Sequence, residues 1–247
     1  MAACLYAWNL GTLPEVDVKT TRDGRIVCLH DDTLARTTDA PDTVREIPVS
    51  ELTYERIRRF DAGAWFDKRF EGQHVPLLEE VFLCMKEDRP REIYLDLKGT
   101  DLGHLTDETA RYGVEERVIV CTCHRHECER FRSLAPRVRT MLWIGGAAEQ
   151  VKDRFENLAG QGFTGLDQVQ LHLSVAVKNG TLCYSVGSGF LREAIRRTQE
   201  AGVVLQVFPA DFDPESVRDL LDLGIRWYAT DEPKRFLECS RSCSTAD

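Results

Sequence analysis

The sequence lacks long hydrophobic runs and an excess of positive charge, and each absence excludes a class of protein. No stretch approaches the roughly 18 consecutive apolar residues of a membrane-spanning helix, so no membrane span is expected. The N-terminal residues MAACLYAWNLG have neither the basic start nor the apolar run of a signal peptide. A net charge of −9 at pH 7 makes nucleic acid and anionic membranes poor general partners, because both would be repelled.

The cysteines give no pattern of disulfide pairing. There are nine, an odd number, and they are scattered along the chain, which favours the reducing cytoplasm as the location. Low-complexity segments and linkers are also absent. The 247 residues, 43% hydrophobic and 30% charged, suffice for a sizeable core and fit either one α/β barrel or two small domains.

Short apolar runs alternate with amphipathic segments along the chain. The runs rich in Val, Ile, Leu and aromatic residues, typical of buried parallel strands, are 13–19, 93–98, 117–122, 139–145, 166–173, 203–208 and 226–231. Residues 190–202 and 214–224 have helical patterns, and each ends at a glycine. Strands that alternate with helices predict βαβ units and a parallel sheet.

The predicted fold class is a TIM-type (β/α) barrel that lacks its first strand. A barrel has eight strands, seven are counted here, and AACLYAWNLG is typical of the tail of a first helix. The barrel is predicted over 1–238 and a polar tail over 239–247. About seventy residues, 20–92, form an insertion that begins with the predicted hairpin arm TRDGRIVCLHDD. Without a first strand, strands 13–19 and 226–231 would have unpaired edges, so self-association is expected.

Acidic residues recur at the ends of two predicted strands. Glu15 and Asp17 stand two residues apart, so both side chains point to one face of the strand. Two carboxylates that share a face repel each other unless a cation lies between them, and oxygen ligands favour Mg²⁺ or Ca²⁺. The alternative is a solvated strand end. Asp96 and Lys98 repeat this spacing on the next strand, where Asp96 would be a third carboxylate and Lys98 would meet a phosphate, unless the two form a buried ion pair.

His30 ends the hairpin arm and is the histidine nearest in sequence to Glu15 and Asp17. Imidazole exchanges protons near neutral pH, which suits general acid–base catalysis. A lone histidine is also common as a structural residue, and the sequence pattern alone leaves both interpretations open.

Residues 13–38, LPEVDVKTTRDGRIVCLHDDTLARTT, resemble the core motif of the glycerophosphodiester phosphodiesterase family. That motif contains E-x-D-V, T-x-D-G and V-x-H-D-x-x-L-x-R-T-T in this order. Three further segments are similar to the family, FDAGAWFDKRFEGQHVPLLEEVF, YLDLKG and YATDEP, so the resemblance covers nearly the whole chain.

The resemblance implies a TIM-type barrel that uses a divalent metal to hydrolyse glycerophosphodiesters to glycerol 3-phosphate and an alcohol. It implies that Glu15, Asp17 and Asp96 are metal ligands, that His30 is one of two catalytic histidines and that Lys98 lies near the substrate phosphate.

The sequence departs from the family at its start and at two positions within the fold. The family's opening H-R-G and P-E-N-T segments, which supply the other histidine, have no counterpart here. Asp96 replaces the usual glutamate, and Phe208 is expected to take the place of an aromatic residue in the family's site. The alternative function is therefore a truncated or non-catalytic barrel that binds metal or glycerol phosphates without turnover.

A rival site is the segment CTCHRHEC, residues 121–128, with three cysteines and two histidines. Zn²⁺ favours such ligands, but the spacing differs from that of zinc fingers. The sequence favours a structural role here, with zinc or redox chemistry as the alternative. Gln170 and His172 are further candidates for the mouth of the barrel, whereas His74 and His104 are expected on the surface.

Overall fold

The computed structural model describes residues 1–87, 91–178 and 181–244. The chain divides into two compact units. The first comprises Met1–Val120 and Phe131–Val138, and the second comprises Cys121–Arg130 and Arg139–Asp247. The sequence-based boundary of one domain over 1–238 therefore stays a prediction.

The first unit combines an open sheet with a largely irregular segment between the second strand and the fourth helix, within the stretch that the sequence analysis described as an insertion. Its strands are β1 (Glu15–Thr20), β2 (Ile26–Cys28), β3 (Ile93–Leu97) and the start of β4 (Val118–Thr122). Its helices are α1 (Ala2–Asn9), α2 (Asp42–Arg45), α3 (Tyr54–Ile57), α4 (Leu78–Glu87), α5 (Leu102–Tyr112) and the end of α6 (Arg125–Leu134). The strand order is β4-β3-β1-β2. β1 runs parallel to β3 and antiparallel to β2.

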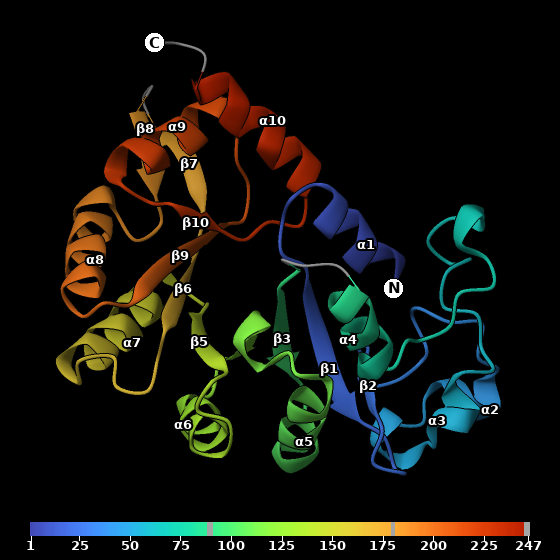
Figure 1. Cartoon of the computed structure of the whole chain (residues 1–247). Helices are drawn as coiled ribbons and strands as arrows, with labels where there is room; N and C mark the ends of the chain where they lie inside the picture. Colours follow the sequence, from blue (N-terminus) through green and yellow to red (C-terminus); the bar gives the residue numbers. More distant parts are fainter. Residues whose placement is uncertain (88–90, 179–180, 245–247) are drawn as a thin grey trace. The chain divides into compact units, whose positions relative to one another are not determined.

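Two apolar clusters support the first unit. In the larger, Leu78 and Phe82 of α4 pack with Val18 of β1 and Leu95 of β3, all fully buried, and Figure 1 shows α4 against these strands. The smaller cluster lies under the insertion and contains Val27, Leu34, Ala40, Val44, Val49, Leu52, Ile57, Val75 and Leu77. The insertion thus has an ordered core of its own, although it contains little regular structure.

The turn between β1 and β2 follows the Asp-Gly pair of the sequence. Gly24 adopts φ +77°, a left-handed conformation that glycine reaches without steric cost. Thr21 accepts a hydrogen bond from the backbone N–H of Arg25, which closes the turn. The two strands therefore pair as an antiparallel hairpin with Val18 opposite Cys28.

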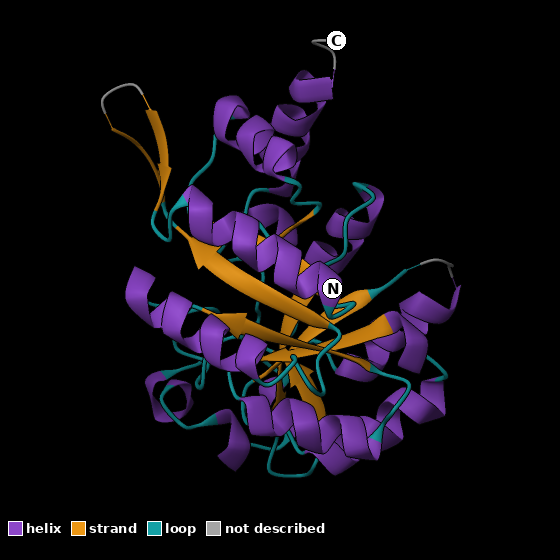
Figure 2. Cartoon of the chain, turned by 90° about the vertical axis from the view of Figure 1, so that its left-hand side faces the viewer, coloured by secondary structure: helices purple, strands orange, loops and turns teal. Residues whose placement is uncertain are grey.

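The second unit has parallel strands and a separate two-stranded hairpin. Its strands are β5 (Arg139–Ile144), β6 (Gln168–Leu173), β7 (Val175–Lys178), β8 (Thr181–Tyr184), β9 (Val204–Pro209) and β10 (Trp227–Tyr228). Its helices are α7 (Ala148–Gly160), α8 (Ser188–Glu200), α9 (Pro214–Leu223) and α10 (Pro233–Ser244). The order β10-β9-β6-β5 is parallel, and β7 pairs antiparallel with β8. Figure 2 shows the β7–β8 hairpin projecting from the helices of this unit.

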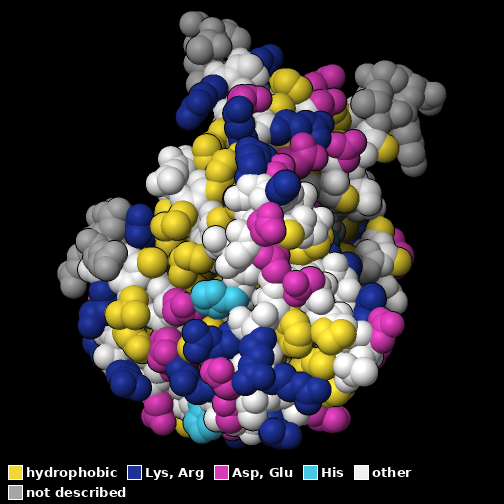
Figure 3. Space-filling model, turned by 90° about the vertical axis from the view of Figure 1, so that its right-hand side faces the viewer, with side chains coloured by type: hydrophobic (Ala, Val, Ile, Leu, Met, Phe, Trp, Pro, Cys, Tyr) yellow, Lys and Arg dark blue, Asp and Glu magenta, His cyan; other side chains and the backbone are white. Residues whose placement is uncertain are grey.

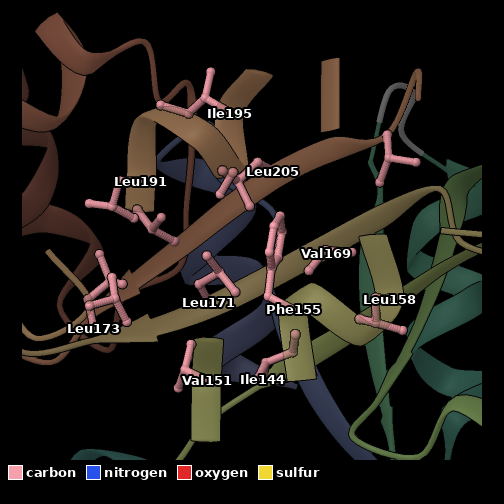
Figure 4. Close-up of a cluster of buried hydrophobic side chains, with 14 of the residues drawn as sticks. Ile144, Val151, Phe155, Leu158, Val169, Leu171, Leu173, Leu191, Ile195 and Leu205 are labelled. Atoms are coloured by element: carbon pink, nitrogen blue, oxygen red, sulfur yellow. The ribbon is translucent and has the colours of Figure 1, made fainter. Parts of the chain in front are cut away.

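Apolar residues at helical spacing bury one face of each large helix. In α8, Leu191, Ala194 and Ile195 are buried, as expected for a helix that covers a sheet. Figure 4 shows Phe155 of α7 among Val169 and Leu171 of β6. α9 begins at the N-cap residue Asp213, whose carboxylate accepts the backbone N–H of Ser216 at 2.8 Å.

The repeated strand–helix order supports a TIM-barrel-like α/β architecture, while the strand ladder within each unit is open. Three differences from the sequence analysis stand out. The predicted strand 226–231 is reduced to the two residues of β10, the β7–β8 hairpin was not predicted, and α10 continues to Ser244 within the predicted polar tail. The N-terminal segment forms α1, and the absence of a first strand stays a prediction.

Candidate active site

Three carboxylates from two neighbouring strands meet in the first unit. Asp17 of β1 is in register with Asp96 of β3, and Glu15 lies two residues earlier on the same face of β1. One oxygen from each of Glu15, Asp17 and Asp96 lies within 4.8 Å of the others. In the described part of the chain, this is the one group of three or more acidic, histidine or cysteine side chains that converges in this way. The structure thus brings together the three residues predicted as metal ligands.

Lys98 lies beside these carboxylates and offsets part of their charge. Its Nζ is 2.7 Å from Oδ2 of Asp96 and 3.7 Å from Oδ1 of Asp17. Burial opposes the charge of Lys98, but the hydrogen bond to Asp96 and the nearby carboxylates outweigh it, so the pKa of Lys98 is raised. Burial also raises the pKa of Asp17, partly offset by His30 and Lys98. The Asp96–Lys98 ion pair and the carboxylate cluster, which the sequence analysis treated as alternatives, are therefore both present.

His30 lies just beyond β2, where the backbone holds it next to the carboxylate strand. The backbone N–H of Leu29 donates to the carbonyl of Asp17 at 2.9 Å, which fixes the segment that carries His30. The imidazole is well exposed, at 69% of its side-chain surface, and its Nδ1 is 2.9 Å from Oδ1 of Asp31. An exposed imidazole with one anchored nitrogen is free to exchange protons with a ligand.

A cavity of about 560 Å³ lies at His30 and Lys98. It is lined by Lys19, His30, Asp31, Asp32, Lys98 and Gly99. Two lysines and a histidine thus border one cavity together with Asp31 and Asp32, and each lysine is paired with a carboxylate. The lysines are the cationic groups that a phosphate-bearing ligand would meet in this chain of net charge −9.

Lys19 was missed as a site residue by the sequence analysis. Its side chain is only 7% exposed, and its Nζ is 2.6 Å from Oδ1 of Asp32, whose side chain is 89% exposed. The spacing Glu15, Asp17, Lys19 places all three on one strand face, and this alternation is the signal that could have identified it.

The donor set of the cluster fits a hard divalent cation. Glu15, Asp17 and Asp96 supply carboxylate oxygen atoms without thiolate or imidazole, the ligand type that Mg²⁺ and Ca²⁺ prefer. The mutual repulsion of three close carboxylates gives a physical reason for a cation between them.

The segment 121–128 does not form a rival metal site among the described residues. Cys121 and Cys128 are buried, and the Cys128 thiol lies 3.5 Å from the carbonyl of Met141. The rings of His124 and His126 are 5.7 Å apart, yet the five side chains do not converge on a common point. This arrangement supports the structural interpretation of the segment.

The second unit contains an aromatic group built from three strands. His172 stacks on Trp143, with ring centroids 5.4 Å apart, and its ring lies 5.0 Å from that of Phe208. Oε1 of Gln170 accepts a hydrogen bond from Nε2 of His172 at 2.9 Å, and Nε2 of Gln170 donates to Oε1 of Gln206 at 2.6 Å. Trp143 was missed by the sequence analysis, and its place near the end of the apolar run 139–145 was the available signal. His74 and His104 are exposed, as predicted.

The model of the glycerophosphoryl diester phosphodiesterase family matches residues 2–235. The chain belongs to this family. It is a phosphoric diester hydrolase by type, and the resemblance found in the sequence motifs is confirmed. In the described residues, no helix is long and apolar enough to cross a membrane.

Relatives and solved structures agree with this assignment. The chain is 23% identical over 227 residues to a glycerophosphodiester phosphodiesterase of Bacillus altitudinis, covering 90% of this chain and 83% of that protein. A probable glycerophosphodiester phosphodiesterase 1 of Mycobacterium tuberculosis is 26% identical over 244 residues, covering 94% and 84%.

Two solved structures support the fold. A glycerophosphodiester phosphodiesterase of Agrobacterium tumefaciens has a TM-score of 0.75 at 22% identity, with 96% of this chain and 91% of that chain covered. A phosphodiesterase of Oleispira antarctica, in complex with the product sn-glycerol-3-phosphate, has a TM-score of 0.71 at 17% identity, with 97% and 90% covered. These likenesses support the TIM-barrel-like fold.

Proposed function

We propose that this chain hydrolyses glycerophosphodiesters to glycerol 3-phosphate and an alcohol at the site formed by Glu15, Asp17, Asp96, His30 and Lys98. The observation that carries the proposal is the convergence of three carboxylates beside a cavity bordered by two lysines and a histidine. Acidic side chains alone would repel a phosphodiester, whereas the lysines attract it.

Glu15, Asp17 and Asp96 would hold one divalent cation, Mg²⁺ or Ca²⁺. When bound, such a cation neutralises the phosphodiester and the charge that develops on its oxygen atoms. Lys98, whose Nζ already lies 2.7 Å from Asp96, contributes a second positive charge for the substrate phosphate. Asp96 is shorter than glutamate by one methylene, and this is the point where the ligand set of the chain differs from that implied by the family.

His30 transfers the proton at the scissile bond. In hydrolysis the oxygen of a water molecule bonds to phosphorus, the bond between phosphorus and the alcohol oxygen breaks, and one proton of the water is released as the departing oxygen gains one. Without that proton the alkoxide is a poor leaving group. An imidazole at the cavity wall, anchored through one nitrogen, is suited to deliver this proton. The cytoplasmic location and self-association expected from the sequence stay predictions.

The test is an assay of glycerophosphocholine hydrolysis with Mg²⁺ or Ca²⁺. Turnover should fall by about 10²-fold or more in His30→Ala and in Glu15→Gln, in keeping with loss of acid–base catalysis and of a metal ligand. Asp42→Asn, at a side chain that is 96% exposed in the same unit, is the control and should leave turnover unchanged. Metal binding without turnover by the wild-type chain would instead support the non-catalytic alternative.

A further inference from the structure

His30 belongs to a chain of polar contacts that the proposed reaction does not use directly. Asp31, whose side chain is 21% exposed, accepts three hydrogen bonds. Nδ1 of His30 lies 2.9 Å from Oδ1, while Arg36 reaches both oxygens, with Nε 2.6 Å from Oδ2 and its second terminal nitrogen 2.7 Å from Oδ1. A two-point contact of this kind fixes the plane of the carboxylate as well as its position.

Arg36 is itself held by an aromatic ring of the insertion. Its guanidinium carbon lies 5.8 Å from the centroid of the Trp65 ring, within the range of a cation–π contact. The indole N–H of Trp65 donates to the carbonyl of Ala62 at 3.0 Å, which orients the ring. Figure 3 shows the face of the molecule that carries the insertion, where hydrophobic side chains lie among Lys, Arg, Asp and Glu.

The segment that carries Trp65 is tied down by a second carboxylate. Asp61 accepts the backbone N–H groups of Gly63 at 2.9 Å and Ala64 at 2.6 Å, and also that of Gly72. Its own N–H donates to the Asp39 carboxylate at 2.7 Å. The exposed ring of Trp65 therefore rests on a braced loop, and this loop supports Arg36.

The charge state of Asp31 determines which nitrogen of His30 carries hydrogen. The hydrogen bond from Arg36 lowers the pKa of Asp31 to about 2, so the group is ionised at any pH at which the protein would be assayed. An ionised carboxylate only accepts hydrogen bonds. The contact at 2.9 Å therefore requires a hydrogen on Nδ1 of His30, which leaves Nε2 as the nitrogen that exchanges protons.

We propose that Asp31 is the positioning residue of His30, and that Arg36, supported by Trp65, holds Asp31 in place. The contacts fix the Nδ1–H tautomer and the orientation of the imidazole at the cavity wall. This inference rests on the proposed function, since it gives His30 a role in proton transfer. It also gives the loop that carries Trp65 a part in the reaction, although this loop is far from His30 in the sequence.

The decisive experiment reads the tautomer of His30 by NMR of the imidazole nitrogens, without substrate, at a pH above that at which the ring is protonated. The signal is assigned by its loss in His30→Ala. In the wild type, Nδ1 should carry the hydrogen and Nε2 should not. In Asp31→Asn, whose amide is able to donate to Nδ1, the population should shift toward the Nε2–H form.

Kinetics provide the second readout. Asp31→Asn should lower kcat by about 10²-fold and change KM by less than about threefold, because orientation rather than binding is lost. Arg36→Gln should lower kcat by about tenfold through the same path. Arg235→Gln is the matched control, because Arg235 of the second unit also pairs with a carboxylate, that of Glu232, and lies 4.5 Å from an aromatic ring, Phe212. It should leave both kcat and the tautomer unchanged.

An unchanged tautomer together with an unchanged kcat in Asp31→Asn overturns the proposal. If Asp31→Asn does not fold, Arg36→Gln is judged by the same two readouts and the same outcome overturns it. Full activity of His30→Ala would instead remove the proposed catalytic role of His30. Because the tautomer is measured without substrate, the two failures are distinguishable.

Discussion

At the scale of single residues, the alternation of side chains along one strand places Glu15, Asp17 and Lys19 on the same face. Alternation along β1 points all three the same way, and pairing with β3 adds Asp96 and Lys98 opposite them. The sequence analysis recognised the carboxylates because two of them on one strand face repel each other unless a cation lies between them. It passed over Lys19, because a lysine near a strand end is ordinary unless its burial is known.

Lys19→Met should weaken binding of a phosphodiester. The substitution removes one of two ammonium groups at the cavity, and a charged hydrogen bond of this kind contributes about 1.5–3 kcal/mol, so KM should rise by about tenfold or more with a smaller change in kcat. Loss of the pair should cost little stability, since Asp32 is 89% exposed and remains solvated. Steady-state kinetics of Lys19→Met against Lys68→Met, an exposed lysine of the same unit, provide the measurement. An equal KM in the two variants would contradict a role of Lys19 in binding.

Glu108 should make stability depend on pH. Burial, and then the nearby Glu79, raise its pKa from 4.5 to about 7. The folded state therefore holds this proton more strongly than the unfolded state, so stability is lost as pH rises from about 4.5 to about 7 and then stays level.

Glu108→Gln should remove that loss. The free energy of unfolding of Glu108→Gln should exceed that of the wild type only slightly at pH 4.5 and by about 1–2 kcal/mol above pH 7. The full pKa shift would correspond to roughly 3 kcal/mol, and the smaller value is expected because the carboxyl group is partly solvated. Thermal unfolding of the two proteins from pH 4 to 8 measures it. Asp107→Asn, an exposed carboxylate on the same helix, is the control. A gain that is constant with pH would show that the charge of Glu108 is not the cause.

At the scale of elements, the loop 61–73 shows how an irregular segment is held without regular structure. Gly63 lies against the backbone of Phe70, where an added Cβ would be 1.9 Å from its carbonyl oxygen. The backbone packs closely at Gly63 because this residue has no side chain. On the other side, the loop is held by the hydrogen bonds that the Asp61 carboxylate accepts. Neither feature follows from hydrophobic periodicity, which is why the sequence analysis described this stretch only as part of an insertion.

Gly63→Ala should disrupt this loop. The new methyl group would clash with backbone atoms of Phe70, which cannot move aside as a flexible side chain would. The loop must therefore shift, which should lower the free energy of unfolding by about 1–3 kcal/mol. Amide hydrogen exchange should accelerate over 61–73 while β3 remains protected. Gly189→Ala, where nothing lies within 4 Å of the added Cβ, should leave both exchange and stability near wild type. Equal exchange in the two variants would argue against the tight packing at Gly63.

For the whole molecule, the balance of charge connects stability with the bound cation. The net charge is −9, and the carboxylates of Glu15, Asp17 and Asp96 converge beside the ammonium group of Lys98. A cation that binds only the folded state stabilises it by about 2.7 kcal/mol at one hundred times its dissociation constant.

Saturating Mg²⁺ or Ca²⁺ should therefore raise the Tm by about 5–10 °C, and a chelator should reverse the shift. Differential scanning calorimetry with each metal identifies which of the two binds more tightly. The shift should be abolished in Glu15→Gln and kept in Asp42→Asn. A Tm that is equal with metal and with chelator in the wild type would exclude a cation site at these carboxylates.

The sequence by itself determined the strand–helix order, the carboxylate pair on β1 and the family, because periodicity, strand alternation and ordered motifs are local properties. Only the tertiary structure decided that Asp17 and Asp96 stand in register, that Lys19 is buried and that Arg36 joins Asp31 to Trp65. These relations depend on strand pairing and on loops that return across many residues, and no local pattern encodes them. For the same reason the short β10 and the β7–β8 hairpin departed from expectation, since pairing partners rather than residue preferences set the length of a strand.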